Sequence, residues 1–376
     1  MYWPSRERRS SLLQLVFPAL SILITTSTVL LAAALPSRVE GPRPLCGSTY
    51  APPFANQGDA APRVCSLARP RNYTPKHRGI GFEILDLESD ACFVSDDSYR
   101  LLDEIVEGVS KRVPLAQPSD ERTKVEQVYA VSRATGDVLA EKGFGLYIPT
   151  ETLGDALVAR NAPGEAPRHI FDCDTGSMIL LTVAESLSLA ASLVEITLPS
   201  GSGHNYVRWH ISDTTSIDWD TNGRAPCTTP SNLPSFQGKS LTRDQTISYV
   251  LAVRAQTWER KRSFVQAIAD YRDAIRLFPD RPGAFNNFAW LIATKEFEGR
   301  SSHKAEGLRA ANEAVALQRT PNHLDTLACV SAFLGDFNAA LNYESEALRG
   351  EPSNEVFKRR LEQFQGQSPK DCTGAD

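Results

Sequence analysis

The chain has 376 residues, of which 41% are hydrophobic and 23% are charged, and its formal net charge is −5. This composition is ordinary for a soluble globular protein, and the length allows two domains with cores of their own. Nucleic-acid binding needs a basic surface, so the acidic balance predicts no nucleic-acid partner.

A basic and then apolar segment opens the chain. Arginines within residues 6–9 precede a mostly apolar run at residues 12–35, and the alanines at 32–34 are a small-residue cleavage candidate. This order is typical of a secretory signal peptide, although about 20 apolar residues also cross a bilayer as a helix. We therefore expect residues 1–36 to be a signal peptide or an N-terminal membrane anchor. Either form sends the rest of the chain out of the cytoplasm, as a periplasmic or secreted protein or one anchored to the inner membrane.

Residues 37–81 are predicted to be a Pro-rich linker without lasting periodicity. The chain contains seven cysteines. In an exported protein they permit up to three disulfides and leave one cysteine unpaired. Cys329 lies in an apolar helical segment, and we interpret it as core packing. The sequence leaves open any pairing among Cys46, Cys65, Cys92, Cys227 and Cys372.

The next elements are predicted from their apolar spacing. They are a short strand at 82–87, a helix at 99–113, a helix at 119–139, a break at 143–149 and a short helix at 153–160. We expect these helices to pack around the segment that follows and to form one wall of a cleft.

Cys173 is placed where a helix should begin. Asp172 and Thr175 are capping residues, and apolar residues recur at helical spacing from Ile179 to Leu187. A helix N-terminus favours the thiolate, the nucleophilic form of cysteine. The charges of Asp172 and Asp174 oppose this effect, because a nearby negative charge raises the pKa of a thiol.

Strands are predicted after this helix, at residues 193–198, 205–211 and 216–220. His204 begins the second strand and Asp218 lies in the third, so a thiol, a base and an orienting carboxylate follow one another. A tight turn at residues 213–214 would pair Asp218 with Trp209, about 17 Å along the strand from His204. A His204–Asp218 contact therefore needs a bulge or a wider loop, or else Asp220 takes that role.

The segments 172–175, 204–209 and 218–221 resemble the core of the transglutaminase-like superfamily, whose members share a Cys-His-Asp triad and a papain-like layout. More closely, they resemble a bacterial transglutaminase-like group that carries tetratricopeptide repeats behind the core. The resemblance covers roughly residues 98–230. It implies an α+β, transglutaminase-like (papain-like) domain at 82–230, with Cys173 as nucleophile, His204 as base and Asp218 as orienter. In relatives the last position can be an amide.

A second linker, residues 231–241, is followed by a repeat at 242–365 and a tail at 366–376. Residues 264–275 and 337–348 are near copies, and a middle copy occupies 305–315. Ala274, Ala314 and Ala347 correspond, at spacings near the tetratricopeptide period of about 34 residues. The polar stretch 295–302 accounts for the longer spacing. We predict an all-α domain of three tetratricopeptide repeats, with residues 354–364 as a capping helix.

Two functions remain open from the sequence. The first is an exported thiol enzyme that hydrolyses a peptide or isopeptide bond, or transfers an acyl group to an amine, with a protein or peptide substrate. Its repeats would bind a partner in their groove. The alternative is a non-catalytic scaffold for protein–protein interaction. The sequence shows no metal-ligand spacing, Gly-rich phosphate loop or Ser-centred elbow, so we expect neither a cofactor nor a metal.

Overall fold

The computed structural model describes residues 72–89, 94–113, 120–146, 152–159, 168–197, 203–221, 229–230, 238–368 and Cys372. The predicted signal or anchor segment, most of the first linker, and Cys46, Cys65, Cys92 and Cys227 lie outside these residues. Within the described residues, no helix combines the length and apolar character needed to cross a membrane. All of them belong to one compact unit, Leu45–Asp376.

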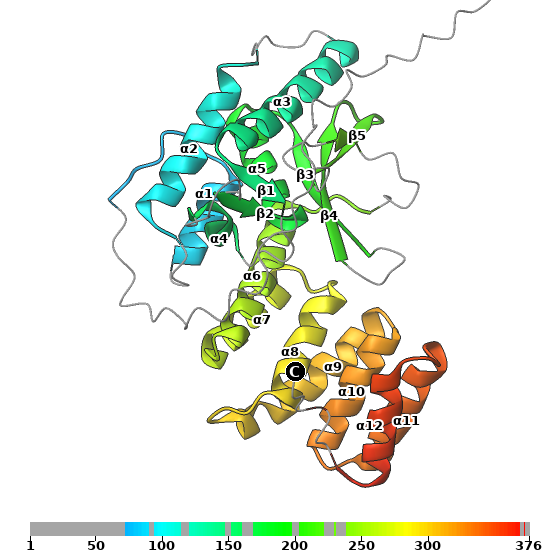
Figure 1. The fold of residues 1–376 in the computed structure, drawn as a ribbon. Coiled ribbons are helices and arrows are strands. Elements are labelled where there is room, and N and C mark those ends of the chain that lie inside the picture. The colour runs from blue at the N-terminus through cyan, green and yellow to red at the C-terminus, as the bar shows by residue number, and fades with distance from the viewer. Residues whose placement is uncertain are drawn as a thin grey trace, which may run out of the picture. The chain divides into compact units, whose positions relative to one another are not determined.

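The first helices of the described chain pack around α5 (Figure 1). They are α1 (Ile80–Glu88), α2 (Asp96–Ser110), α3 (Glu121–Glu141) and α4 (Leu153–Leu157), and α5 spans Cys173–Ser186. The predicted strand at 82–87 is wrong, because Ile80, Ile84 and Leu85 share the buried face of helix α1. Gly81 permits close contact with α5: an added Cβ would lie 2.2 Å from the Thr182 hydroxyl, which accepts the Gly81 N–H at 2.9 Å.

The strands form two sheets within the described residues. A parallel pair joins β1 (Phe144–Leu146) to β2 (His169–Phe171), and an antiparallel sheet has the order β3-β4-β5-β6. The antiparallel strands are β3 (Ala191–Thr197), β4 (Gly203–His210), β5 (Ser216–Asp220) and β6 (Thr229–Pro230). The predicted strands correspond to β3, β4 and β5, and their prediction is confirmed. The β1–β2 pair was not predicted.

The antiparallel sheet has two different faces. Val207 and Trp209 of β4 and Trp219 of β5 are buried in the main core, on the face that contacts α5. Tyr206 packs with Val194 in a separate small cluster on the opposite face. Because side chains alternate along a strand, His204 lies on the Tyr206 face.

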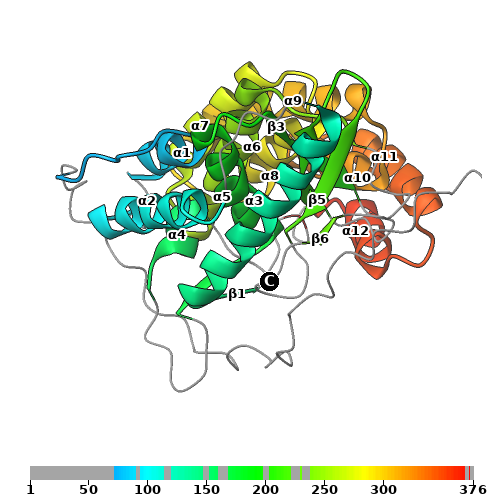
Figure 2. The same ribbon diagram turned by 90° about the horizontal axis from the view of Figure 1, so that it is seen from above.

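Helix α3 covers the turn end of the β4–β5 hairpin (Figure 2). Lys124 donates from Nζ to the Ile211 carbonyl at 3.0 Å, and the Tyr129 ring meets the Trp219 ring edge-on with centroids 5.6 Å apart. These contacts fix β5 relative to β4, which determines where the carboxylates of β5 lie.

The rest of the chain is all-helical and TPR-like. Its helices are α6 (Arg243–Arg260), α7 (Phe264–Leu277), α8 (Pro282–Thr294), α9 (Lys304–Leu317), α10 (Pro321–Phe333), α11 (Phe337–Gly350) and α12 (Glu355–Gln365). The near copies predicted from the sequence are α7, α9 and α11, the second helix of each pair. Ala274, Ala314 and Ala347 are completely buried, as small residues at helix crossings should be. The polar stretch that lengthens the middle repeat lies between α8 and α9 and contains the 3-10 turn η2 (Arg300–His303).

Cys329 is buried in α10, as expected, but it is not a free core thiol. It forms a disulfide with Cys372, with the two Cα atoms 5.6 Å apart. The interpretation of Cys329 as simple packing is therefore wrong, because the chain after α12 brings Cys372 back against α10. Cys173 is the free cysteine of the described residues.

The repeats are packed directly onto the core region. Ser240 pairs with Val194 of β3, so the described end of the predicted linker adds to the sheet. Arg243 at the start of α6 binds Glu83 of α1 and Glu185 of α5, each at 2.6 Å. Contacts of this kind make the first repeat part of the same unit as the thiol helix.

A buried acidic cluster joins the last repeat helices. Arg360 of α12 binds Asp325 of α10 and lies over the Trp290 ring, with its guanidinium carbon 4.9 Å from the ring centroid. Glu344 of α11 is fully buried near the carboxylate of Asp325. Burial, and then the charge of Asp325, raise the pKa of Glu344 from 4.5 to about 9. Glu344 is therefore protonated in the folded protein at neutral pH.

We expect Glu344→Gln to stabilise the protein by about 2 kcal/mol at pH 8.5 and to change little at pH 4.5. The folded-state pKa is raised, so the stability linked to this proton is complete below pH 4.5 and is lost as the pH rises through about 9. Glutamine keeps a neutral hydrogen-bonding group at every pH. Thermal melts at both pH values test this, with Glu346→Gln on the same helix as the control, because Glu346 is paired with Arg319. An equal Tm for Glu344→Gln and the unmodified protein at pH 8.5 contradicts it.

Candidate functional site

Cys173 is the first residue of helix α5, as predicted. The carboxylate of the N-cap residue Asp172 accepts the backbone N–H groups of Asp174 at 3.1 Å and Thr175 at 3.0 Å. The Thr175 hydroxyl accepts the Asp172 N–H at 3.0 Å, which completes a capping box. This reciprocal pattern stabilises a helix start and fixes the chain direction at Cys173.

The thiol of Cys173 is partly buried between α5 and β4. It donates a hydrogen bond to Asp174 Oδ1 at 3.3 Å and lies near the backbone N–H of Asn205. Burial raises the pKa of Cys173 well above its ordinary value, and the carboxylates of Asp174 and Asp172 raise it further. These effects exceed the opposing effect of the helix dipole, so the thiol is protonated in the resting site.

His204 lies in β4, directly before Asn205. Its imidazole is 7% exposed, and Nε2 lies 3.3 Å from Asp220 Oδ2. The strand register explains this contact: Arg208 is opposite Asp218, so Asp220 lies opposite Tyr206 and diagonal to His204 on the same face. Diagonal neighbours in an antiparallel pair are within reach of long or aromatic side chains. Asp220 therefore contacts Nε2 of the imidazole, and the second ring nitrogen is Nδ1.

Asp218 does not contact His204, contrary to the expectation from the resemblance. Arg208 donates to both carboxylate oxygens of Asp218, from Nε at 2.7 Å and Nη2 at 2.9 Å. Asp218 is directly opposite Arg208 in the sheet, two positions farther from His204 than Asp220 is. The carboxylate brought to His204 is thus Asp220, which the sequence left as the alternative.

Asp174 and its partners are residues of the site that the sequence did not reveal as a group. Asn205 donates from Nδ2 to Asp174 Oδ1 at 2.6 Å. Burial raises the pKa of Asp174, and the nearby Tyr249 hydroxyl of α6 lowers it. The sequence marks Asp174 only as a charge beside the thiol.

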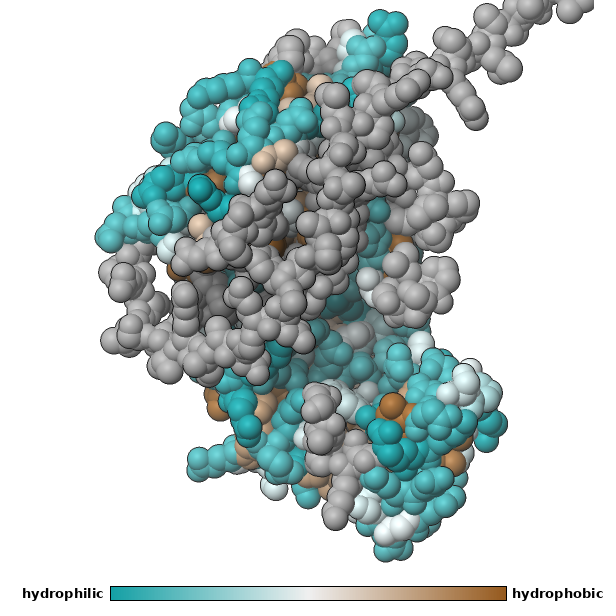
Figure 3. Space-filling view, in the orientation of Figure 1, coloured by the Kyte–Doolittle hydropathy of each residue, from teal (hydrophilic) through white to brown (hydrophobic). Residues whose placement is uncertain are grey.

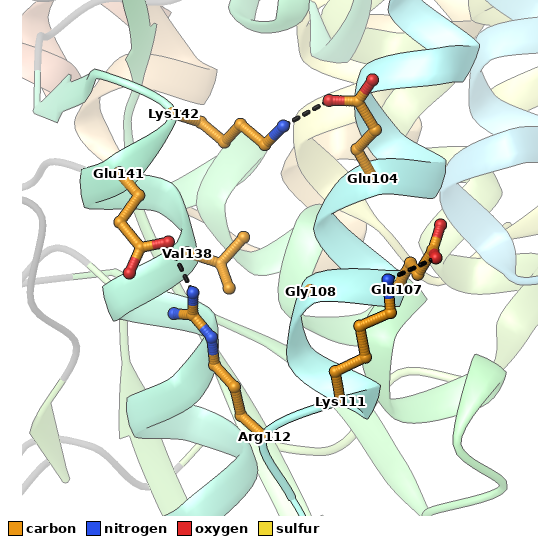
Figure 4. A pocket seen from close by; sticks show the side chains of 8 residues that line it. All are labelled: Glu104, Glu107, Gly108, Lys111, Arg112, Val138, Glu141 and Lys142. Atoms are coloured by element: carbon orange, nitrogen blue, oxygen red, sulfur yellow. Dashed lines mark hydrogen bonds and ion pairs between the residues drawn. The ribbon is translucent and has the colours of Figure 1, made fainter.

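Two surface pockets lie elsewhere on the described chain. Figure 4 shows the first, which is lined by residues of α2 and α3 and by none of α5, β4 or β5. Its charges are matched in pairs: Lys142 with Glu104, Arg112 with Glu141 at 2.5 Å and Lys111 with Glu107 at 2.7 Å. We interpret these pairs as ordinary solvated ion pairs, two between the helices and one, Lys111–Glu107, within a single helical segment.

The second pocket is a groove of about 710 Å³ on the repeats, formed by α6, α7 and α8 with the chain at the end of α8. It contains the aromatic residues Phe264, Tyr271 and Trp290, together with charges of both signs. On the face that Figure 3 shows, the described surface is mostly hydrophilic, with small separate apolar areas. Among the described residues, no group of His, Cys, Asp or Glu is placed to hold a metal ion.

No protein-family model matches the sequence, and no curated protein does. The transglutaminase-like resemblance therefore stays a prediction. Solved structures of TPR domains match about a third of the chain. An NMR structure of the first TPR domain of human RPAP3 is 19% identical and covers 33% of this chain and 93% of its own, with a TM-score of 0.30.

Two further solved structures give similar values. The first TPR of Spaghetti (RPAP3), bound to the HSP90 peptide SRMEEVD, is 20% identical and covers 32% of this chain and 93% of its own, with a TM-score of 0.29. A thermophilic TPR protein of Thermus thermophilus is 19% identical and covers 33% of this chain and 62% of its own, with a TM-score of 0.26. The chain is thus similar in structure to TPR domains over about a third of its length.

Proposed function

We propose that this protein is an exported thiol enzyme that acts on amide bonds of a protein or peptide, and that its repeats bind the substrate or a protein partner. The observation that carries the catalytic part is the His204–Asp220 contact, since His204 directly precedes Asn205, whose side chain binds the same Asp174 carboxylate as the Cys173 thiol. A nucleophile, a base and a carboxylate that orients the base are the parts that acyl transfer through a thiol needs.

In the proposed reaction, Cys173 Sγ attacks the carbonyl carbon of the amide while its proton moves to His204 Nδ1. Asp220 holds Nε2 and stabilises the charged imidazolium. The proton then passes to the leaving amine, which departs and leaves a thioester on Cys173. Water releases an acid and completes hydrolysis, whereas a second amine completes acyl transfer.

The start of α5 limits where the oxyanion can bind. The N–H groups of Asp174 and Thr175 are both occupied by the Asp172 carboxylate. The Cys173 N–H is therefore the candidate donor from this helix start.

The groove on the repeats supports the binding part of the proposal. Phe264 and Trp290 provide aromatic surface, and Arg260, Lys295 and Glu259 provide charges at the same groove. Aromatic residues with a few polar groups are typical of sites that take up a peptide. Helical repeats of the TPR type form such grooves for protein partners.

Export is part of the same proposal. The basic and then apolar N-terminus predicts it, and the Cys329–Cys372 disulfide fits an oxidising compartment outside the cytoplasm. Anchoring to a membrane remains the alternative to cleavage of this segment.

A non-catalytic scaffold is the second candidate, and a specific observation favours it. The Cys173 thiol donates to Asp174, and its pKa is raised. A nucleophile in regular use has its pKa lowered instead. In this alternative the repeats carry the function, and the core region only supports them.

A peptide that bears a thiol-reactive group at the position of the scissile amide tests the choice. We expect it to label Cys173 in the folded protein, and His204→Ala to slow that labelling at least about 100-fold. Mass spectrometry of the digested product identifies the labelled cysteine. Labelling at the same rate in the folded and the urea-unfolded protein would favour the scaffold.

A further inference from the structure

Arg262 has a left-handed backbone conformation in the turn between α6 and α7. Its φ is 59°, in a region that residues other than glycine adopt at a steric cost. The near copies 264–275 and 337–348 align Arg262 with Gly335, in the turn between α10 and α11 of the last repeat. Gly335 has a φ of 86°, so the two repeats place an arginine and a glycine in the same kind of conformation.

The hydrogen bonds of the two turns confirm that these positions are equivalent. In the first repeat, the Ser263 N–H binds the Trp258 carbonyl at 2.8 Å, and the Arg262 N–H binds the Glu259 carbonyl at 2.9 Å. The corresponding bonds of the last repeat are 2.9 and 3.0 Å long. This pattern ends a helix with a left-handed residue, which is usually glycine. The first repeat thus keeps an arginine where the turn favours glycine, and a residue held at such a cost indicates a role for its side chain.

The side chain of Arg262 lines the groove on the repeats. It is exposed, and within the part of the chain that the structure describes its guanidinium forms no ion pair or hydrogen bond. The same holds for the ammonium group of Lys295, which lines the groove at the end of α8. Two cations of the groove are therefore available to a ligand.

The acidic residues of the groove are occupied within the protein. Glu259 accepts the Tyr271 hydroxyl at 2.6 Å, and burial raises the pKa of Glu259 above its ordinary value. Glu296 is paired with Arg300, whose side chain is buried. The charge that the groove presents to a ligand is thus positive, although the whole chain has a net charge of −5.

Two aromatic rings of the groove are held by neighbouring side chains. The Phe264 and Phe297 rings lie with their centroids 5.3 Å apart, and the guanidinium carbon of Arg360 lies 4.9 Å from the centroid of Trp290. Rings held in this way need little further ordering when a ligand binds.

We propose that Arg262 and Lys295 bind the carboxylates of an acidic segment of a protein or peptide, and that this segment places an apolar side chain against Phe264 and Trp290. The volume of the groove, about 710 Å³, is within the range of about 300–1,000 Å³ that is usual for ligand sites. The inference rests on the proposed binding role of the repeats and specifies the chemistry of their partner. It does not depend on the thiol chemistry.

The test is fluorescence anisotropy with the full chain and a fluorescein-labelled peptide that has glutamates on both sides of a single leucine. We expect this acidic peptide to bind, and a version with lysine in place of glutamate not to bind. Added salt should weaken the binding, because the two cations are accessible to solvent. Arg262→Gly and Lys295→Gln should each weaken it about fivefold or more at low salt.

Arg262→Gly should also keep or raise the Tm, because glycine adopts the left-handed conformation without the steric cost. Gln367→Gly is the matched control. Gln367 follows α12, has a φ of 53° and is not among the residues that line the groove. Its replacement should affect the Tm in the same direction and leave peptide binding unchanged. Weaker binding by an Arg262→Gly variant that melts no earlier than the unmodified protein separates a binding role from a loss of fold.

The proposal is overturned if the acidic peptide does not bind, or if Arg262→Gly binds it as tightly as the unmodified protein. Equal binding of a version with serine in place of leucine, together with displacement by inorganic phosphate, would make the groove a small-anion site and overturn it too. Labelling of Cys173 by the thiol-reactive peptide described above, the amide-mimic probe, is measured separately. Peptide binding without labelling leaves this inference standing and removes the proposed enzyme function, whereas labelling without peptide binding removes this inference alone.

Discussion

Asp220→Asn is expected to slow acylation of Cys173 by the amide-mimic probe about 10²–10⁴-fold, whereas Asp218→Asn should slow it less than about tenfold. Asp220 lies 3.3 Å from His204 Nε2, so its charge stabilises the imidazolium that forms when the thiol proton is taken up. Asparagine keeps the shape of that side chain and loses the charge. Asp218 binds Arg208 and has no such role.

The pair of variants is matched, because both remove one carboxylate charge from β5. Loss of the Arg208–Asp218 ion pair should appear in thermal melts rather than in the acylation rate. Both rates are second-order constants from mass spectrometry under identical conditions. The reverse order of the two rates would restore Asp218 as the orienter and refute the assignment of Asp220.

The position of these carboxylates was the hardest feature to predict from the sequence. A tight turn at residues 213–214 pairs Asp218 with Trp209, which places Asp218 and Asp220 on the face opposite His204. In the structure the turn is wider, with the N–H groups of Ile211 and Ser212 both bound to the Thr215 carbonyl. Arg208 is then opposite Asp218. A shift of one residue reverses the face of every side chain, and the turn alone decides it.

Features determined by neighbouring residues were more predictable. The Asp172–Thr175 capping box and the apolar residues behind it locate Cys173 at the start of a helix, and the repeated alanines identify the second repeat helices. The prediction of a strand at 82–87 was wrong because a short apolar run fits a strand or a buried helix equally well. The Arg281–Glu195 ion pair depends on how the first repeats pack against the core, and no local pattern encodes that packing.

Reduction of the Cys329–Cys372 disulfide is expected to lower the free energy of unfolding of the repeats by about 2–4 kcal/mol. The bond spans 43 residues of sequence, so it restricts the unfolded chain across α10, α11 and α12. It also holds the chain after α12 against α10, where both cysteines are buried. Thermal melts followed by circular dichroism, with and without reductant, measure the change.

Cys372→Ala separates this bond from any other that reductant breaks. The variant leaves Cys329 in place, so α10 loses the cross-link without gaining a cavity at its fully buried position. We expect Cys372→Ala to melt at the temperature of the reduced protein and to lose most of its response to reductant. If the variant instead melts with the oxidised protein, the cross-link does not stabilise the repeats, and the disulfide no longer supports the proposed export into an oxidising compartment.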